Sequence, residues 1–226
     1  MDSIDTHDPH GLFAGYRRFR ERAWQPQLAR WDELRQGQSP HTLIIACSDS
    51  RVDPAQIFDV DPGELFVVRN VAAMVPPYET TPGYHGVSAA VEFAVNFLRV
   101  EQVVVMGHGM CGGCKAALSQ DLRGASAGEG GFVASWVSLL DETRAQVAAE
   151  HGTEGRKAEI EMERAGVRTS IANLRSFPFV VQAESEGRLA IHGAHFAISD
   201  GLLHWMNPAS GKFAPVAVSH GSSRGE

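Results

Sequence analysis

Two short apolar runs, each followed at once by residues that can bind a metal, constrain this chain more than any other feature. Residues 42–46 (TLIIA) lead into residues 47–51 (CSDSR), and residues 103–106 (VVVM) lead into residues 107–113 (GHGMCGG). Apolar runs of this length, rich in β-branched residues, are typical of buried strands in a parallel sheet. Ligands collect beyond the carboxyl ends of such strands. We therefore expect one site that draws on both segments.

The residue types at these two strand ends predict a zinc site. Zinc prefers four tetrahedral sulfur, nitrogen or oxygen ligands, and Cys47, Asp49, His108 and Cys111 supply four. Taken singly, each has a simpler interpretation: a buried free cysteine, a polar turn, or a histidine satisfied at a strand end. Their combination at two strand ends, with glycine around the second, favours a metal.

The order of predicted elements indicates an α/β fold. Strands are expected at residues 42–47, 64–70, 102–106, 188–199 and 201–206, with helices between most of them, at about 53–58, 86–100, 111–120, 132–151, 155–177 and 178–187. Alternation of this kind implies right-handed crossovers and a central, mostly parallel sheet covered on both faces. A strand order of about 2-1-3-4, plus an edge strand, brings the ends of the first and third strands together. We expect the strand at 64–70 to be buried.

Residues 1–226 are expected to form a single domain, because a chain of 226 residues is within the size range of one α/β domain. Residues 1–36 are expected to form a helical arm rich in aromatic side chains. We expect the arm to pack on a partner subunit, with packing on the chain's own core as the alternative. Residues from about 216 to 226 are polar and glycine-rich, and are expected to form a flexible tail.

Charge and cysteine content exclude several classes of protein. The formal net charge is −7, so no basic face for nucleic acid is expected. Neither a signal peptide nor a long apolar span is evident, which predicts a cytoplasmic protein without a membrane partner. Three cysteines do not make a disulfide framework and suit a reducing compartment. Residues 111–114 also form a CGGC motif, and redox chemistry like that of thioredoxin is therefore an alternative to metal binding. The metal site already uses Cys111 as a ligand, and Cys114 is expected in the core.

Three motifs then resemble one family closely. CSDSR, PGELFVVRNVA and GHGMCGG, at this spacing, are similar to the motifs of β-class carbonic anhydrases. The resemblance runs from about Gln38 to Gly113 and extends more weakly through NLRSFPFV and LAIHGAHFAISDG. It implies reversible hydration of carbon dioxide to bicarbonate and a proton by a zinc-bound hydroxide. It also implies one zinc ion per chain and a homodimer or dimer-based tetramer.

The family pattern makes Asp49 a conditional ligand. It assigns zinc to Cys47, His108 and Cys111, with Asp49 either as the fourth ligand or displaced by water. Four protein ligands close a zinc ion, whereas three leave a position for chemistry. Arg51 can hold the carboxylate of Asp49 by paired hydrogen bonds and so keep it off the metal. Because thiolates donate more charge than imidazoles, activity is expected to rise toward alkaline pH.

The resemblance also predicts a substrate pocket. Gln38 matches the glutamine of the glutamine-containing, plant-type (type I-like) group, whose side-chain amide can donate a hydrogen bond to the substrate oxygen. An apolar wall is expected from Phe66, Val71 and Phe93, with Gly112 beside it. Simple core packing is the alternative for the three apolar residues. The other group of the family carries tryptophan and tyrosine where this chain has Ile44 and Phe196, so inhibition by bicarbonate at that group's extra site is not expected.

Two further functions share these ligands. One is hydrolysis of carbonyl sulfide or carbon disulfide by the same fold, and the other is a zinc-stabilised interaction protein without catalysis. The proton carrier is open: His41, His85 and His195 are candidates because histidine titrates near neutral pH. A surface histidine without a role is the simpler interpretation for each.

Overall fold

The computed structural model describes residues 8–218. They fall into two compact units, divided between Ser39 and Pro40, and each unit is described by itself. Residues 219–226 of the predicted tail, and residues 1–7 of the predicted arm, lie outside the described range. The first unit is helical. Its elements are a 3₁₀ turn at Pro9–Gly11, α1 (Leu12–Phe19), a π-helical turn at Arg20–Trp24 and α2 (Leu28–Leu34). Aromatic contacts hold it together, including an edge-on contact between Phe19 and Trp31 at 6.0 Å.

The second unit is built on a six-stranded sheet with the order β2-β1-β3-β4-β5-β6. The strands are β1 (Thr42–Cys47), β2 (Leu65–Asn70), β3 (Gln102–His108), β4 (Ala190–Ala197), β5 (Leu202–Met206) and β6 (Phe213–Pro215). β1 to β4 pair in parallel, and β5 and β6 are antiparallel. The predicted order 2-1-3-4 with an added edge is therefore confirmed, and β6 extends that edge.

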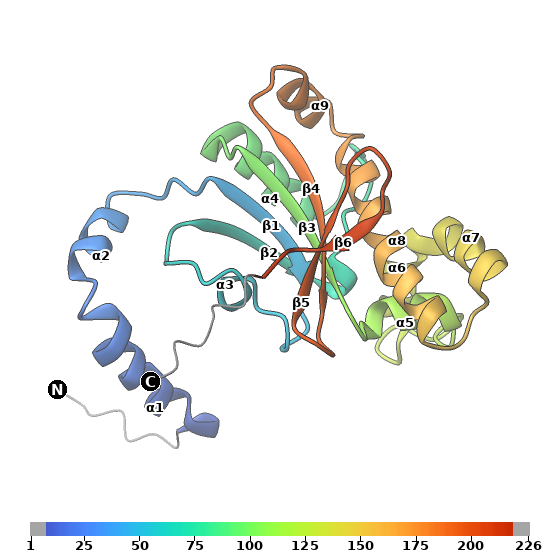
Figure 1. The fold of residues 1–226 in the computed structure, drawn as a ribbon, viewed down its shortest axis with the longest axis horizontal. Coiled ribbons are helices and arrows are strands. Elements are labelled where there is room, and N and C mark those ends of the chain that lie inside the picture. The colour runs from blue at the N-terminus through green and yellow to red at the C-terminus, as the bar shows by residue number, and fades with distance from the viewer. Residues whose placement is uncertain (1–7, 219–226) are drawn as a thin grey trace. The chain divides into compact units, whose positions relative to one another are not determined.

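Helices connect the parallel strands, as the alternating pattern predicts. They are α3 (Pro54–Ile57), α4 (Gly86–Glu92), α5 (Gly112–Ser119), α6 (Gly131–Val137), α7 (Asp141–His151), α8 (Arg156–Leu174) and α9 (Pro178–Ser185), with short turns of other helix types at Val71–Ala73, Phe93–Leu98 and Ser138–Leu140. Figure 1 shows α5, α6, α7 and α8 gathered on one side of the sheet. None of the helices described is long and apolar enough to cross a membrane.

Side chains of the central strands alternate between two apolar clusters, one on each face of the sheet. Leu43 and Ile45 of β1 join the cluster that α8 and α9 cover, whereas Ile44 and Ala46 join the cluster on the opposite face. Because successive strand residues point to opposite faces, a continuous apolar run is what a strand covered on both faces requires. The sheet thus holds the ends of β1 and β3 rigidly side by side.

The prediction of a buried strand at residues 64–70 is wrong. β2 lies at the edge of the sheet with only β1 beside it. Its residues are half-buried within this chain, and Val67 is 40% exposed. An apolar run alone does not distinguish a central strand from an edge strand that is open in a single chain.

Gly107→Ala is expected to destabilise the second unit by about 1–3 kcal/mol, because overpacking of a filled core forces shifts of this cost. An added Cβ at Gly107 would lie 2.7 Å from Cγ2 of Val167 on α8. Gly86→Ala is the matched control, since a Cβ there meets nothing within 4 Å. Urea unfolding of both metal-free variants measures the difference, and equal midpoints would contradict the predicted close contact.

Candidate metal centre

Two neighbouring strands and one helix start bring three potential ligands together. Cys47 ends β1, His108 ends β3, and Cys111 is the residue that caps the start of α5. All three are buried, and their ligand atoms lie within 4.8 Å of one another. The two Sγ atoms are 3.9 Å apart. β1 and β3 pair in parallel with Ala46 opposite Met106, which explains why residues so distant in sequence converge.

His108 is oriented as a metal ligand would be. Its Nδ1–H donates to the carbonyl of Gly109 at 2.9 Å, which leaves Nε2 as the free acceptor nitrogen. Nε2 is buried and, within residues 8–218, has no hydrogen-bond partner. In a histidine that binds a metal through one ring nitrogen, the other ring nitrogen usually donates its hydrogen to a carbonyl or carboxylate, and this bond fixes the orientation of the ring. The orphaned nitrogen beside two thiols therefore fits a cation.

The two thiols resist ionisation when no cation is present. Hydrogen bonding with Cys111, together with burial, raises the pKa of Cys47 to about 12. Hydrogen bonding with Cys114, together with burial, raises the pKa of Cys111 to about 12. A metal would displace both protons, because thiolates are the form that binds metals. Two thiolates and one imidazole are a ligand set that suits zinc.

Asp49 lies next to the three ligands and is hydrogen-bonded to Arg51. Arg51 donates from Nε to Oδ1 at 2.9 Å and from Nη2 to Oδ2 at 2.7 Å, and its backbone N–H adds a bond to Oδ1 at 3.0 Å. Hydrogen bonding from Arg51 holds the pKa of Asp49 well below its usual range. Oδ2 of Asp49 is 4.0 Å from Nε2 of His108. The carboxylate is thus ionised, paired and close to the ligand cluster.

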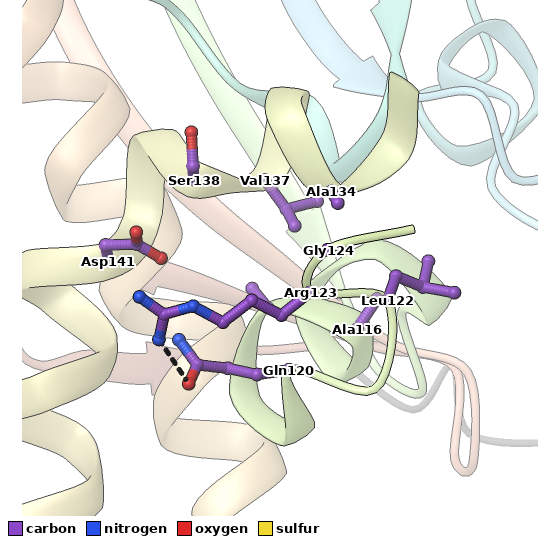
Figure 2. Close-up of a pocket in the computed structure, with 10 residues that line it drawn as sticks. Ala116, Gln120, Leu122, Arg123, Gly124, Ala134, Val137, Ser138 and Asp141 are labelled. Atoms are coloured by element: carbon purple, nitrogen blue, oxygen red, sulfur yellow. Dashed lines mark hydrogen bonds between the residues drawn. The ribbon is translucent and has the colours of Figure 1, made fainter. Parts of the chain in front are cut away.

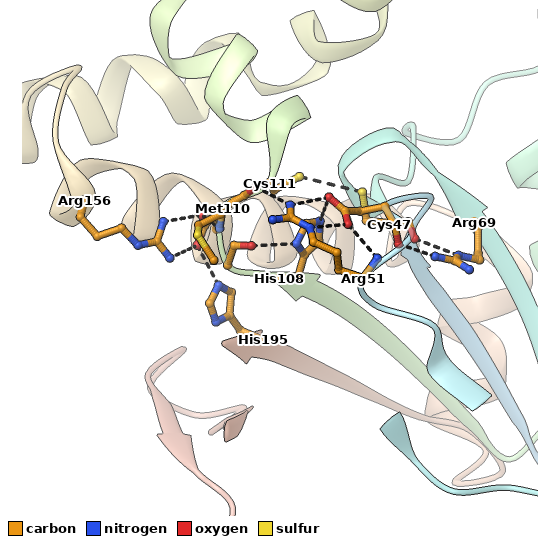
Figure 3. Close-up of polar contacts among 11 residues, drawn as sticks. Cys47, Arg51, Arg69, His108, Met110, Cys111, Arg156 and His195 are labelled. Atoms are coloured by element: carbon orange, nitrogen blue, oxygen red, sulfur yellow. Dashed lines mark hydrogen bonds and ion pairs between the residues drawn. The ribbon is translucent and has the colours of Figure 1, made fainter. Parts of the chain in front are cut away.

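Arg69 fixes the backbone that carries Cys47 and Asp49. It donates to the carbonyl of Cys47 at 2.9 Å and to the carbonyl of Asp49 at 2.7 Å (Figure 3). It also pairs with Asp53 at 3.0 Å. Asp53 in turn accepts bonds from the first backbone N–H groups of α3, as its predicted capping position requires. These bonds hold the turn after β1 in one conformation.

The predicted pocket residues fall into three places. Val71 follows β2 and lies against α5, where its Cγ1 would be 2.7 Å from a Cβ added to Gly113, next to Gly112. Phe66 pairs with Leu43 and therefore lies about 13 Å along the sheet from the strand end, at the usual rise per residue. The ring of Phe93 packs on the ring of Phe66, with 5.9 Å between their centroids. Gln38 belongs to the first unit, and its role in the pocket stays a prediction.

A buried polar cluster beside the ligands was not predicted. Glu163 of α8 accepts bonds from the Met110 backbone N–H, from Arg156 and from His195. Burial raises the pKa of Glu163, but the bonds from His195 and Arg156 outweigh it and hold that pKa below its ordinary value. His195 is 2% exposed, so the interpretation of this residue as a surface histidine is wrong. In the sequence, Glu163 is one acid among several on a helix, with nothing to mark it.

Two hollows lie near α5. One, of about 210 Å³, opens beside Met110, Cys111 and Lys115, next to the ligand cluster. The other, of about 200 Å³, lies between α5, α6 and the loop after α5, and is lined by side chains that include Gln120, Arg123 and Asp141 (Figure 2). None of the residues predicted for the site lines this second hollow, so we assign the chemistry to the first.

Comparisons with known proteins agree on one family. The family model described as carbonic anhydrase matches residues 42–203. A carbonic anhydrase of Pseudomonas aeruginosa is 38% identical over 207 residues, which cover 91% of each protein. The structure of the β-carbonic anhydrase CcaA is 30% identical, with a TM-score of 0.84 over 92% of this chain and 98% of that chain. One of the structures of two tetrameric β-carbonic anhydrases from Sordaria macrospora is 26% identical, with a TM-score of 0.73 over 92% of this chain and 98% of that chain.

Proposed function

The chain belongs to the β-class carbonic anhydrases, and from this premise we propose that it hydrates carbon dioxide reversibly to bicarbonate and a proton with one zinc ion held by Cys47, His108 and Cys111. The observation that carries the zinc proposal is the convergence of two buried thiols and an unpartnered imidazole nitrogen within 4.8 Å. A zinc ion bound there would act as a Lewis acid that makes a water molecule nucleophilic toward carbon dioxide.

We propose that Asp49 and Arg51 decide whether the fourth zinc position is open. Two hydrogen bonds, of 2.9 and 2.7 Å, hold the carboxylate of Asp49 against the guanidinium of Arg51. In this arrangement Cys47, His108 and Cys111 would hold the metal, and the fourth position would be left for substrate chemistry. The same carboxylate, 4.0 Å from Nε2 of His108, is near enough to become the fourth ligand if Arg51 releases it.

The substrate pocket is proposed to be of the glutamine-containing type. Val71 and Gly112 flank the ligand cluster from the side of α5. Phe66 lies on β2 and contacts Phe93, which begins the π-helical turn after α4 and is 43% exposed within one chain. We propose that these two rings, with Gln38, complete the pocket of a partner subunit, so that each pocket is built from two chains.

We also propose that the chain assembles as a homodimer or as a tetramer built from dimers. The Sordaria macrospora relatives are described as tetrameric. The helical arm adds a second reason, because its apolar side chains are open in a single chain: Leu12 is 66% exposed and Tyr16 is 59% exposed. Packing of the arm on a partner subunit would bury them. The cytoplasmic location and the lack of nucleic-acid and membrane partners stay predictions.

Stopped-flow hydration of carbon dioxide by the purified protein tests the proposal. We expect activity that falls when zinc is removed with a chelator, returns when zinc is added back, and rises toward alkaline pH because two thiolates donate charge to the metal. Carbonyl sulfide and carbon disulfide are assayed in parallel. Hydrolysis of either without hydration of carbon dioxide would favour the alternative hydrolase, and a zinc-loaded protein inactive in all assays would favour an interaction protein.

A further inference from the structure

Glu163 is a buried carboxylate that faces the segment between two of the metal ligands. It lies on α8 and is 2% exposed. Its Oε1 accepts the backbone N–H of Met110 at 2.7 Å and a guanidinium N–H of Arg156 at 2.8 Å. Its Oε2 accepts the Nε2–H of His195 at 2.9 Å and a second, longer bond from Arg156 at 3.3 Å. In Figure 3, Arg156 and His195 converge on this point from two directions.

Met110 needs such a partner because its backbone conformation is unfavourable. It stands between His108 and Cys111 with φ at +58°, in the left-handed region that side-chain-bearing residues seldom adopt. Its peptide groups are held from both sides: Glu163 binds its N–H, and Nη2 of Arg51 binds its carbonyl at 3.1 Å. This turn sets how far Cys111 lies from His108.

Further contacts hold Gly109, the residue before Met110, in place. A Cβ added to Gly109 would lie 3.1 Å from Nη2 of Arg156, so the guanidinium packs directly on the turn. The N–H of Gly109 donates to the carbonyl of Phe196 at 2.8 Å, and His195 precedes Phe196 on β4. The carboxylate of Glu163 therefore joins α8, β4 and the turn through charged or backbone donors, which make the stronger hydrogen bonds.

We propose that Glu163 is a positioning residue that holds the Met110 turn in its left-handed conformation and thereby fixes the spacing of His108 and Cys111 for zinc. The proposal rests on the proposed zinc-dependent function. It differs from a purely structural role, in which the buried ion pair would stabilise the fold without affecting the metal. Arg156 is the counter-ion that keeps the carboxylate in place.

Zinc affinity of the metal-free, full-length protein tests the proposal, measured by competition with a chromogenic chelator. We expect Glu163→Ala to bind zinc about 10- to 100-fold more weakly, the usual cost of losing a residue that supports a metal ligand. Glu163→Gln retains a carbonyl oxygen for the Met110 N–H and should stay within about threefold of wild type. Glu161→Ala is the matched control, since Glu161 lies on the same helix and pairs with Arg164 at 3.8 Å and with Arg168 at 3.7 Å, but does not line the hollow beside Met110 and Cys111.

A rescue experiment separates positioning from folding. Asparagine adopts the left-handed conformation more readily than methionine, so Met110→Asn in the Glu163→Ala background should recover most of the lost zinc affinity. If Glu163→Ala weakens zinc binding only by loosening the fold, the double variant should bind zinc as weakly as Glu163→Ala, and this result would overturn the proposal.

The remaining outcomes each decide the question. Equal zinc affinities for Glu163→Ala and Glu161→Ala would overturn the proposal alone. A wild-type protein that binds no zinc would overturn the proposed function and this inference with it. If Glu163→Ala does not fold, as circular dichroism would reveal, Arg156→Gln takes its place because Arg156 is partly exposed. A zinc affinity at least about threefold below wild type supports the proposal, and an unchanged one overturns it.

Discussion

Cys47→Ser should remove zinc and catalysis together. A serine hydroxyl does not ionise at neutral pH, so the variant leaves only one thiol and one imidazole to hold the metal. We expect zinc affinity to fall by at least about 100-fold and carbon dioxide hydration to fall to the uncatalysed rate. Metal content after gel filtration and stopped-flow hydration measure the two effects. The fold should persist, because Cys47 and serine differ little in size.

Cys114→Ala is the matched control for this variant. Cys114 is buried like Cys47 and lies three residues beyond Cys111, but it is not part of the ligand cluster. Zinc and activity should remain, with only a modest loss of stability. The pair of variants also tests the thioredoxin-like alternative, because dithiol redox chemistry needs Cys114 and the metal site does not. A Cys47→Ser protein that keeps its zinc would contradict the assigned ligands.

The parts of the site that the sequence predicts are those encoded locally. The apolar, β-branched runs in residues 42–47 and 102–108 predict strands, and Cys47 and His108 stand at the ends of these runs. Whether the two ligands meet therefore depends only on the strand order. The connections between parallel strands leave few orders open. The capping role of Asp53 before Pro54 is equally local, and the structure contains both the cap and the helix.

The parts that the sequence does not predict depend on tertiary distance. Glu163 and His195 are 32 residues apart and meet only because α8 packs across β3 and β4. A glutamate and a histidine at helix and strand positions are ordinarily read as exposed. The edge position of β2 depends on which strands lack a neighbour in the sheet, and the residues of β2 alone do not determine this. β6 spans only three residues, which are too few to show a periodic pattern.

Arg51→Ala should leave zinc bound and still impair hydration, by about 10- to 100-fold. Without the bonds at 2.9 and 2.7 Å, the carboxylate of Asp49 is no longer held away from the metal. Removing the guanidinium also lets the pKa of Asp49 rise toward its ordinary value. The carboxylate is ionised at alkaline pH with or without Arg51. A loss of activity there therefore reports where the carboxylate lies and not whether it is charged.

Arg175→Ala is the matched control for Arg51→Ala. Arg175 holds Glu184 with two bonds of 3.0 Å on α8 and α9, and its side chain is 47% exposed, as is that of Arg51. Its loss removes a comparable ion pair outside the site and should not affect hydration. An Arg51→Ala protein with wild-type activity would show that the dyad does not gate the site.

The double variant Arg51→Ala/Asp49→Ala decides how Asp49 acts. If the freed carboxylate closes the fourth zinc position, then deleting it should raise activity above that of Arg51→Ala at equal zinc content. If Asp49 instead serves by orienting the attacking water through a hydrogen bond, the double variant should be no more active than the single one. Hydration rates normalised to bound zinc distinguish these outcomes. Recovery would identify Asp49 as a ligand that Arg51 withholds, because only a competing ligand improves a site by its removal.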